Sequence, residues 1–190
     1  MKKVLLAASI ASALSLFNFA HANSGTIDFD GEVVDATCDV VVNDGSATVT
    51  TVTLPAVSKG LLAGANSVAG KTAFRLMLSN CKDFSGLTGK SVAAYYKPDA
   101  TNVDSATGLL NNTATTGAAT NVQLQLLDGT NNSEIMVGFA NQMTSAGFVS
   151  IAGTEPTTAV LPYFVQYKSV AGGATAGDVK GTVAFDLMYK

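Results

Sequence analysis

The chain has 190 residues, of which 47% are hydrophobic and 13% charged, and its formal net charge is −3. This length is enough to bury the core of one domain. A single arginine, Arg75, and an excess of acidic over basic residues argue against a surface that holds nucleic-acid phosphates.

Residues 1–22 have the features of a cleaved secretory signal peptide. Lys2 and Lys3 precede an apolar stretch from Val4 to Phe19, and Ala20-His21-Ala22 supplies the small residues of a cleavage site. A membrane anchor is the alternative, but the apolar stretch is shorter than the roughly 20 residues that a spanning helix needs. The sequence therefore predicts export of a mature chain that starts at Asn23.

Cleavage changes the chemistry that the chain offers. The mature chain lacks histidine, because His21 is the only one, and its net charge becomes −5, since 9 basic residues face 14 acidic ones. Most hydrolytic and metal chemistry loses its usual base or ligand, so we expect no catalytic residue, no metal site and no cofactor. No second apolar segment is long enough to insert into a membrane.

An alternating segment, GTIDFDGEVV, opens the mature chain at Gly25–Val34. One face carries Ile27, Phe29, Gly31 and Val33, and the other carries polar or acidic residues. This pattern favours a strand with one apolar face. The alternative is a hairpin turn at Asp30-Gly31, a strong turn dipeptide.

The two cysteines, Cys38 and Cys81, predict one structural disulfide in an exported chain. A metal or redox pair is the alternative, but it lacks both a C-x-x-C spacing and histidine partners.

Alternation with a period of two dominates the rest of the chain and predicts half-buried strands. These strands are expected at residues 47–54, 72–78, 91–96, 121–127, 161–168 and 182–190. Turn-forming residues separate them, with a long polar connection at 99–120 and a short helical turn near 58–65. About seven short strands without a helical period favour an all-β, immunoglobulin-like sandwich.

The last of these runs, TVAFDLMYK, continues to the C-terminus. It places Val183, Phe185, Leu187 and Tyr189 on one face. A core strand needs a hydrogen-bonding neighbour on each side, and no later segment in the sequence supplies one. We therefore hypothesise that the first strand of one copy completes the last strand of another.

The mature chain as a whole resembles the structural subunits of chaperone–usher, type 1-like fimbriae of Gram-negative bacteria. The resemblance rests on the opening GTIDFDGEVVDATC, on LMLSNC at the second cysteine and on NVQLQLLD. It also rests on the penultimate Tyr189 and on Gly177, fourteenth from the end. The agreement of several signatures in order makes it specific.

The resemblance implies an incomplete immunoglobulin-like sandwich at residues 36–190 that lacks its last strand, with a donor strand extension at residues 23–35. A periplasmic chaperone would lend a strand to the vacant groove, and at an outer-membrane usher the extension of the next subunit would replace it. Ile27, Phe29, Gly31 and Val33 would insert. Gly177, Val183, Phe185, Leu187 and Tyr189 would form the groove, and the chaperone would hold the carboxylate of Lys190.

The family also implies partners and a destination: the chaperone, the usher, copies of the chain and other fimbrial subunits, in a surface fimbrium that supports adhesion. A fimbrial adhesin or secreted carbohydrate-binding module is the alternative, in which tyrosines would contact sugar. Tyr95, Tyr96, Tyr163 and Tyr167 are the candidates, although core and sheet packing is the favoured explanation for them. An enzyme is disfavoured by the lack of histidine and of clustered carboxylates.

Overall fold

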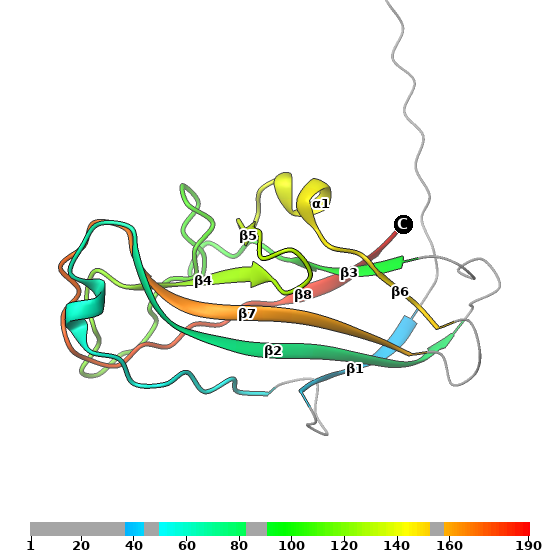
Figure 1. The fold of residues 1–190 in the computed structure, drawn as a ribbon, viewed down its shortest axis with the longest axis horizontal. Helices are drawn as coiled ribbons and strands as arrows, with labels where there is room; N and C mark the ends of the chain where they lie inside the picture. The colour runs from blue at the N-terminus through cyan, green and yellow to red at the C-terminus, as the bar shows by residue number, and fades with distance from the viewer. Residues whose placement is uncertain (1–36, 44–49, 83–90, 153–157) are drawn as a thin grey trace, which may run out of the picture. The chain divides into compact units, whose positions relative to one another are not determined.

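Antiparallel strands are the main regular secondary structure of the described residues (Figure 1). The computed structural model describes residues 37–43, 50–82, 91–152 and 158–190, which all belong to the unit Asp35–Lys190. The signal peptide at 1–22 and the extension at 23–35 lie outside the described residues.

The larger sheet has the strand order β1-β2-β7-β4-β5. Its members are β1 (Thr37–Val42), β2 (Ser67–Lys82), β7 (Ala159–Ser169), β4 (Gln123–Asp128) and β5 (Glu134–Ile135). The long strands β2 and β7 form its centre, and their inward positions carry the apolar residues Leu76, Leu78 and Leu161. Strand β1 is one edge of this sheet.

The smaller sheet has the order β6-β3-β8. Its members are β6 (Val149–Ser150), β3 (Ser91–Tyr96) and β8 (Phe185–Tyr189). Strand β3 pairs with β8 along five residues but with β6 along only two, so much of its second edge needs another cover.

The two sheets enclose one apolar core. Tyr163 from β7 and Tyr96 from β3 meet in an edge-to-face contact with ring centroids 5.4 Å apart, and Val92 in the same core is fully buried. Burial of each such large side chain stabilises the fold by about 1.5–3 kcal/mol. Two facing antiparallel sheets around a shared core are the sandwich that the sequence predicts.

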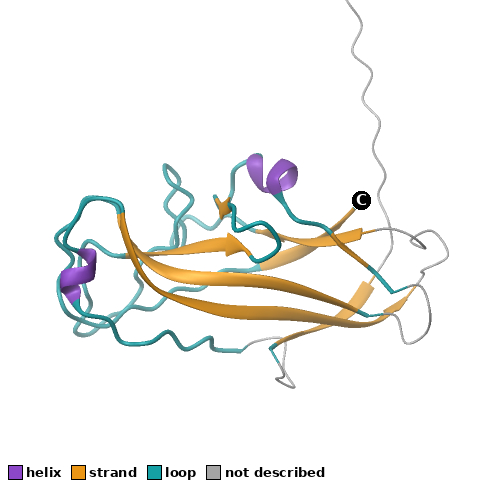
Figure 2. Ribbon diagram, viewed as in Figure 1, coloured by secondary structure: helices purple, strands orange, loops and turns teal. Residues whose placement is uncertain are grey.

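Helical structure is confined, in the part of the chain that the structure describes, to two short segments (Figure 2). A 3-10 turn covers Lys59–Leu62, begins at Ser58 and buries Leu62, as predicted for the region near 58–65. Helix α1 covers Asn141–Ser145 and was not predicted. A five-residue helix has no room for an apolar periodicity.

The predicted strands match the structure unevenly. The run 91–96 has the bounds of β3, and 72–78, 121–127, 161–168 and 182–190 correspond to β2, β4, β7 and β8 with shifted ends. The strand predicted at 47–54 is wrong where the structure describes it, because residues 50–54 form no ladder. Their alternation has another cause: Val52 and Leu54 pack on the core while Thr51 and Thr53 are exposed.

Candidate functional site

Strand β8 has one edge without a partner among the described residues. Ser91 and Lys190 exchange two hydrogen bonds of 2.9 Å, and the N–H of Lys97 donates to the carbonyl oxygen of Ala184 at 2.8 Å. Main-chain direction alternates along an antiparallel strand, so the even-numbered residues of β8 face β3. The N–H and C=O groups of Phe185, Leu187 and Tyr189 therefore face the other way, and we call this side of β8 the open edge.

The side chains at the open edge are apolar and half-buried. Val183, Phe185, Leu187 and Tyr189 all pack against the core, whereas Asp186 between them is exposed. The sequence predicted this shared face. Its residues keep a substantial part of their surface in water, although a strand covered on both sides would bury it.

A second row of half-buried apolar side chains packs against the same core from the edge strand of the larger sheet and the segment after it. The row consists of Val40 in β1 and of Val52 and Leu54. The sulfur of Cys38, also in β1, lies 3.8 Å from the hydroxyl oxygen of Tyr189 in β8. The edge strands of the two sheets thus approach each other at this point.

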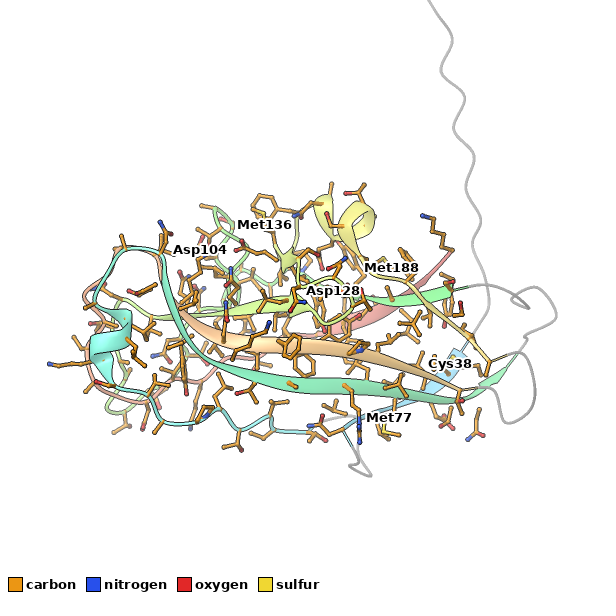
Figure 3. The ribbon with its side chains drawn as sticks, in the orientation of Figure 1. Cys38, Met77, Asp104, Asp128, Met136 and Met188 are labelled. Atoms are coloured by element: carbon orange, nitrogen blue, oxygen red, sulfur yellow. A yellow bond between two sulfur atoms is a disulfide. The ribbon has the colours of Figure 1, made fainter. Side chains whose placement is uncertain are left out.

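The predicted disulfide between Cys38 and Cys81 is present and joins β1 to the end of β2 (Figure 3). It fixes β1 to the larger sheet beside Tyr189. Burial raises the pKa of the Tyr189 phenol, so its neutral form persists to a higher pH than that of an exposed tyrosine.

Gly177 lies apart from β8, in a cleft of about 330 Å³. Its lining residues include Leu54, Val57, Tyr167 and Val179. Gly177 has φ +154°, and a Cβ there would overlap the backbone of residues 117–119. Only glycine fits this position, because a neighbouring loop forms a bridge from Ala118 to Asp178.

Lys190 ends the described chain with its main chain bonded to Ser91, and its ammonium lies 5.6 Å from the centre of the Phe148 ring. The donor residues Ile27, Phe29, Gly31 and Val33 lie outside the described residues.

The structure also bears on the tyrosines considered for sugar binding. Tyr96 and Tyr163 are almost fully buried in the core and cannot stack on a ligand. The described residues contain no cluster of three or more side chains suited to a metal ion, and none of their helices could span a membrane.

Sequence reasoning missed the second row, Val40, Val52 and Leu54. The signal for Val52 and Leu54 was the alternation in residues 47–54, which was interpreted as a paired strand.

An immunoglobulin-like sandwich with an open strand edge is the class that this fold and site define. The solved structures show the same fold: the P pilus rod subunit PapA superposes with a TM-score of 0.54 at 18% identity, covering 80% of this chain and 99% of that one. A second structure, of a chaperone–usher pilus, gives a TM-score of 0.51 at 19% identity over 89% of this chain and 97% of that one.

Sequence comparisons give the family. The model of the type-1 fimbrial protein, A, matches residues 54–190. The major fimbrial subunit SMF-1 of Stenotrophomonas maltophilia is 40% identical over 90% of this chain and 95% of its own length. The F17 fimbrial protein of Escherichia coli is 38% identical over 98% of this chain and 95% of its own length. The chain belongs to the type-1 fimbrial protein family: it is a structural subunit of a chaperone–usher fimbria at the cell surface.

Proposed function

We propose that this subunit polymerises by strand addition at the open edge, where the N-terminal extension of the next copy inserts. The single observation that carries the proposal is the main-chain direction of Phe185, Leu187 and Tyr189, whose hydrogen-bonding groups face away from β3. Addition of a strand to an exposed sheet edge is the mode of assembly known for pilins.

The apolar face of the extension suits this edge. Ile27, Phe29 and Val33 would pack beside the half-buried Phe185 and Leu187, and their burial would contribute roughly 5–9 kcal/mol before the cost of ordering the arm. Each new main-chain hydrogen bond would add about 1 kcal/mol. Gly31 permits close approach of the two backbones.

Before assembly, a periplasmic chaperone would occupy the same edge and bind the carboxylate of Lys190, and an outer-membrane usher would exchange it for the next subunit. The strand edge explains the need for a chaperone, because unpaired N–H and C=O groups beside apolar side chains promote aggregation. The proposed role is structural, without catalytic residues. Asymmetric contacts between the front of one copy and the back of another extend as a fibre unless rotation closes a ring.

Deletion of Asn23–Asp35 tests the proposal. The truncated subunit should bind its chaperone and form no fibres, as seen by electron microscopy and by chaperone co-purification. Fibres assembled from the truncated subunit alone would contradict it.

A matched pair of point variants refines the test. Phe29→Asp should abolish assembly, because the inserted face would carry a charge. Asp28→Ser changes the opposite face and should assemble normally. Equal fibre yields from the two variants would show that the alternating face is not what inserts.

A further inference from the structure

Beyond the short strand β6, the side of β3 that faces away from β8 has no partner strand among the described residues. Because the Ser91–Lys190 pair is hydrogen-bonded, alternation directs the main-chain groups of Ala94 and Tyr96 away from β8. Strand β6 pairs with β3 only at Ser91 and Val92, so it does not reach Ala94 or Tyr96. Left bare, these groups would form a second template for strand addition.

Side chains occupy this position instead of a strand. The N–H of Tyr96 donates to Oε1 of Gln142 at 3.0 Å, and Nε2 of Gln142 donates to the carbonyl oxygen of Tyr96 at 3.0 Å. The N–H of Ala94 donates to the hydroxyl of Tyr163 at 2.9 Å. The Gln142 amide thus offers Tyr96 the same donor and acceptor that a residue of a neighbouring strand would offer. We call these main-chain groups of Ala94 and Tyr96 the capped edge.

The helix that carries Gln142 is fixed by the turn after β4. Oδ2 of the buried Asp128 accepts from the N–H of Gly147 at 2.7 Å, and Nδ2 of Asn131 donates to the carbonyl oxygen of Ser145 at 2.9 Å. Figure 3 labels Asp128 in the region of α1. Added atoms at Gly147 would overlap Thr130, which indicates how closely this segment packs on the turn.

Gln142 differs from an ordinary core residue in that its buried side chain is polar and hydrogen-bonded. It is 4% exposed, and burial of an amide is unfavourable unless its polar atoms are hydrogen-bonded. Both bonds go to a single residue, Tyr96, on the strand edge. An apolar side chain of similar size would leave the N–H and C=O groups of Tyr96 without these two hydrogen bonds.

We propose that Gln142 and Tyr163 determine where a strand can be added: they close the capped edge to the N-terminal extension of another copy and so restrict assembly to the open edge. This inference rests on the proposed function of the open edge. It makes the two residues specificity determinants for linear growth, although neither belongs to the open edge. Their loss would allow a subunit to accept two arms and the fibre to branch.

Intact fibres of the mature chain provide the test, with the variants Gln142→Met, Tyr163→Phe and both together. Gln142→Met keeps the volume and removes both hydrogen bonds, and Tyr163→Phe removes one oxygen atom. Met143→Ala is the matched control, because Met143 lies on the same helix and is 56% exposed. The probe is a fluorescent synthetic peptide with the sequence of Gly25–Asp35, added to preassembled fibres.

Two readouts are expected to change together. Amide hydrogens of Tyr96 and Ala94 should exchange about tenfold faster in the variants, which corresponds to the loss of one hydrogen bond. The double variant should bind at least about tenfold more peptide per subunit than wild type, because every capped edge then offers a site. Electron microscopy should show branched or laterally paired fibres, and Met143→Ala should match wild type.

Variant fibres with faster exchange at Tyr96 but no additional peptide would overturn the inference, as would unchanged exchange at both amides. If Gln142→Met yields no fibres, Tyr163→Phe carries the test through the amide of Ala94. A different result is expected if the extension of the next copy does not fill the open edge. Wild-type fibres would then bind about one peptide per subunit, because an unfilled open edge offers one strand site.

Discussion

The two edges of the smaller sheet carry the same main-chain N–H and C=O groups, but they differ in whether side chains bond them. At the capped edge, Gln142 and Tyr163 supply side-chain partners to the main chain of β3. At the open edge, the main-chain N–H and C=O groups of Phe185, Leu187 and Tyr189 face away from β3, and their half-buried side chains pack against the core. Among the described residues, side chains therefore bond the main chain of one edge, whereas the outward main-chain groups of β8 have no partner strand.

The largest expected effect comes from a charge at the open edge. Leu187→Asp should reduce fibre yield by more than about tenfold, because burial of an unpaired carboxylate beneath an inserted strand costs several kcal/mol. Asp186→Asn is the control, since Asp186 lies on the opposite, exposed face of β8. Quantitative electron microscopy measures both. Normal fibre yield from Leu187→Asp would remove this edge from the assembly site.

The disulfide beside the open edge should have the next largest effect. Replacement of Cys38 and Cys81 by alanine should lower the free energy of unfolding by about 4 kcal/mol, because the bridge closes a loop with a sequence separation of 43 residues. Denaturant titration of the chaperone-free fibre measures the change. A loss below about 1 kcal/mol would mean that the bridge does little to hold β1 beside Tyr189.

Alkaline pH should destabilise the fold, because it charges the phenol of the buried Tyr163. Burial raises the pKa of Tyr163 to about 12 from an ordinary value of 10.0. The folded chain therefore holds the phenolic proton more tightly than the unfolded chain, so this stabilisation is complete below pH 10 and is lost as the pH rises towards 12. The loss is about 2–3 kcal/mol. The free energy of unfolding, measured between these pH values, should fall by this amount in wild type and by less in Tyr163→Phe.

The smallest effect is expected on the exposed face of β8. Lys97 and Asp186 form an ion pair of 3.1 Å with both side chains well exposed. Lys97→Ala should change the free energy of unfolding by no more than about 0.5 kcal/mol and leave fibre yield unchanged, because solvent screens such pairs. A larger change in a thermal melt would indicate that this face also takes part in assembly.

Much of the open edge could be predicted from the sequence. The alternation in residues 182–190 identified the shared face of Val183, Phe185, Leu187 and Tyr189, because side-chain direction in a strand follows from its period of two. Residues 91–96 gave β3 with its observed bounds. The disulfide followed from two cysteines in an exported chain.

The capped edge could not be predicted, for a physical reason. Gln142 gains its role only when the turn after β4 brings α1 beside Tyr96, which is 46 positions away in the sequence. No local pattern encodes that contact, and a five-residue helix has no periodicity to reveal it. The incorrect strand prediction at residues 47–54 has a similar cause. Alternating burial requires an apolar surface on one side of the chain but does not require a hydrogen-bonded neighbour.

The alternation in β8 has a consequence for the spacing of the fibre. At the open edge, the main-chain groups that face away from β3 and the side chains that pack on the core belong to the same odd-numbered residues. An arm displaced by one residue would present its acidic face to the core, whereas a displacement by two would restore both the ladder and the apolar contacts. Errors in the distance between successive subunits should therefore occur in steps of about 7 Å, the length of two residues in a strand.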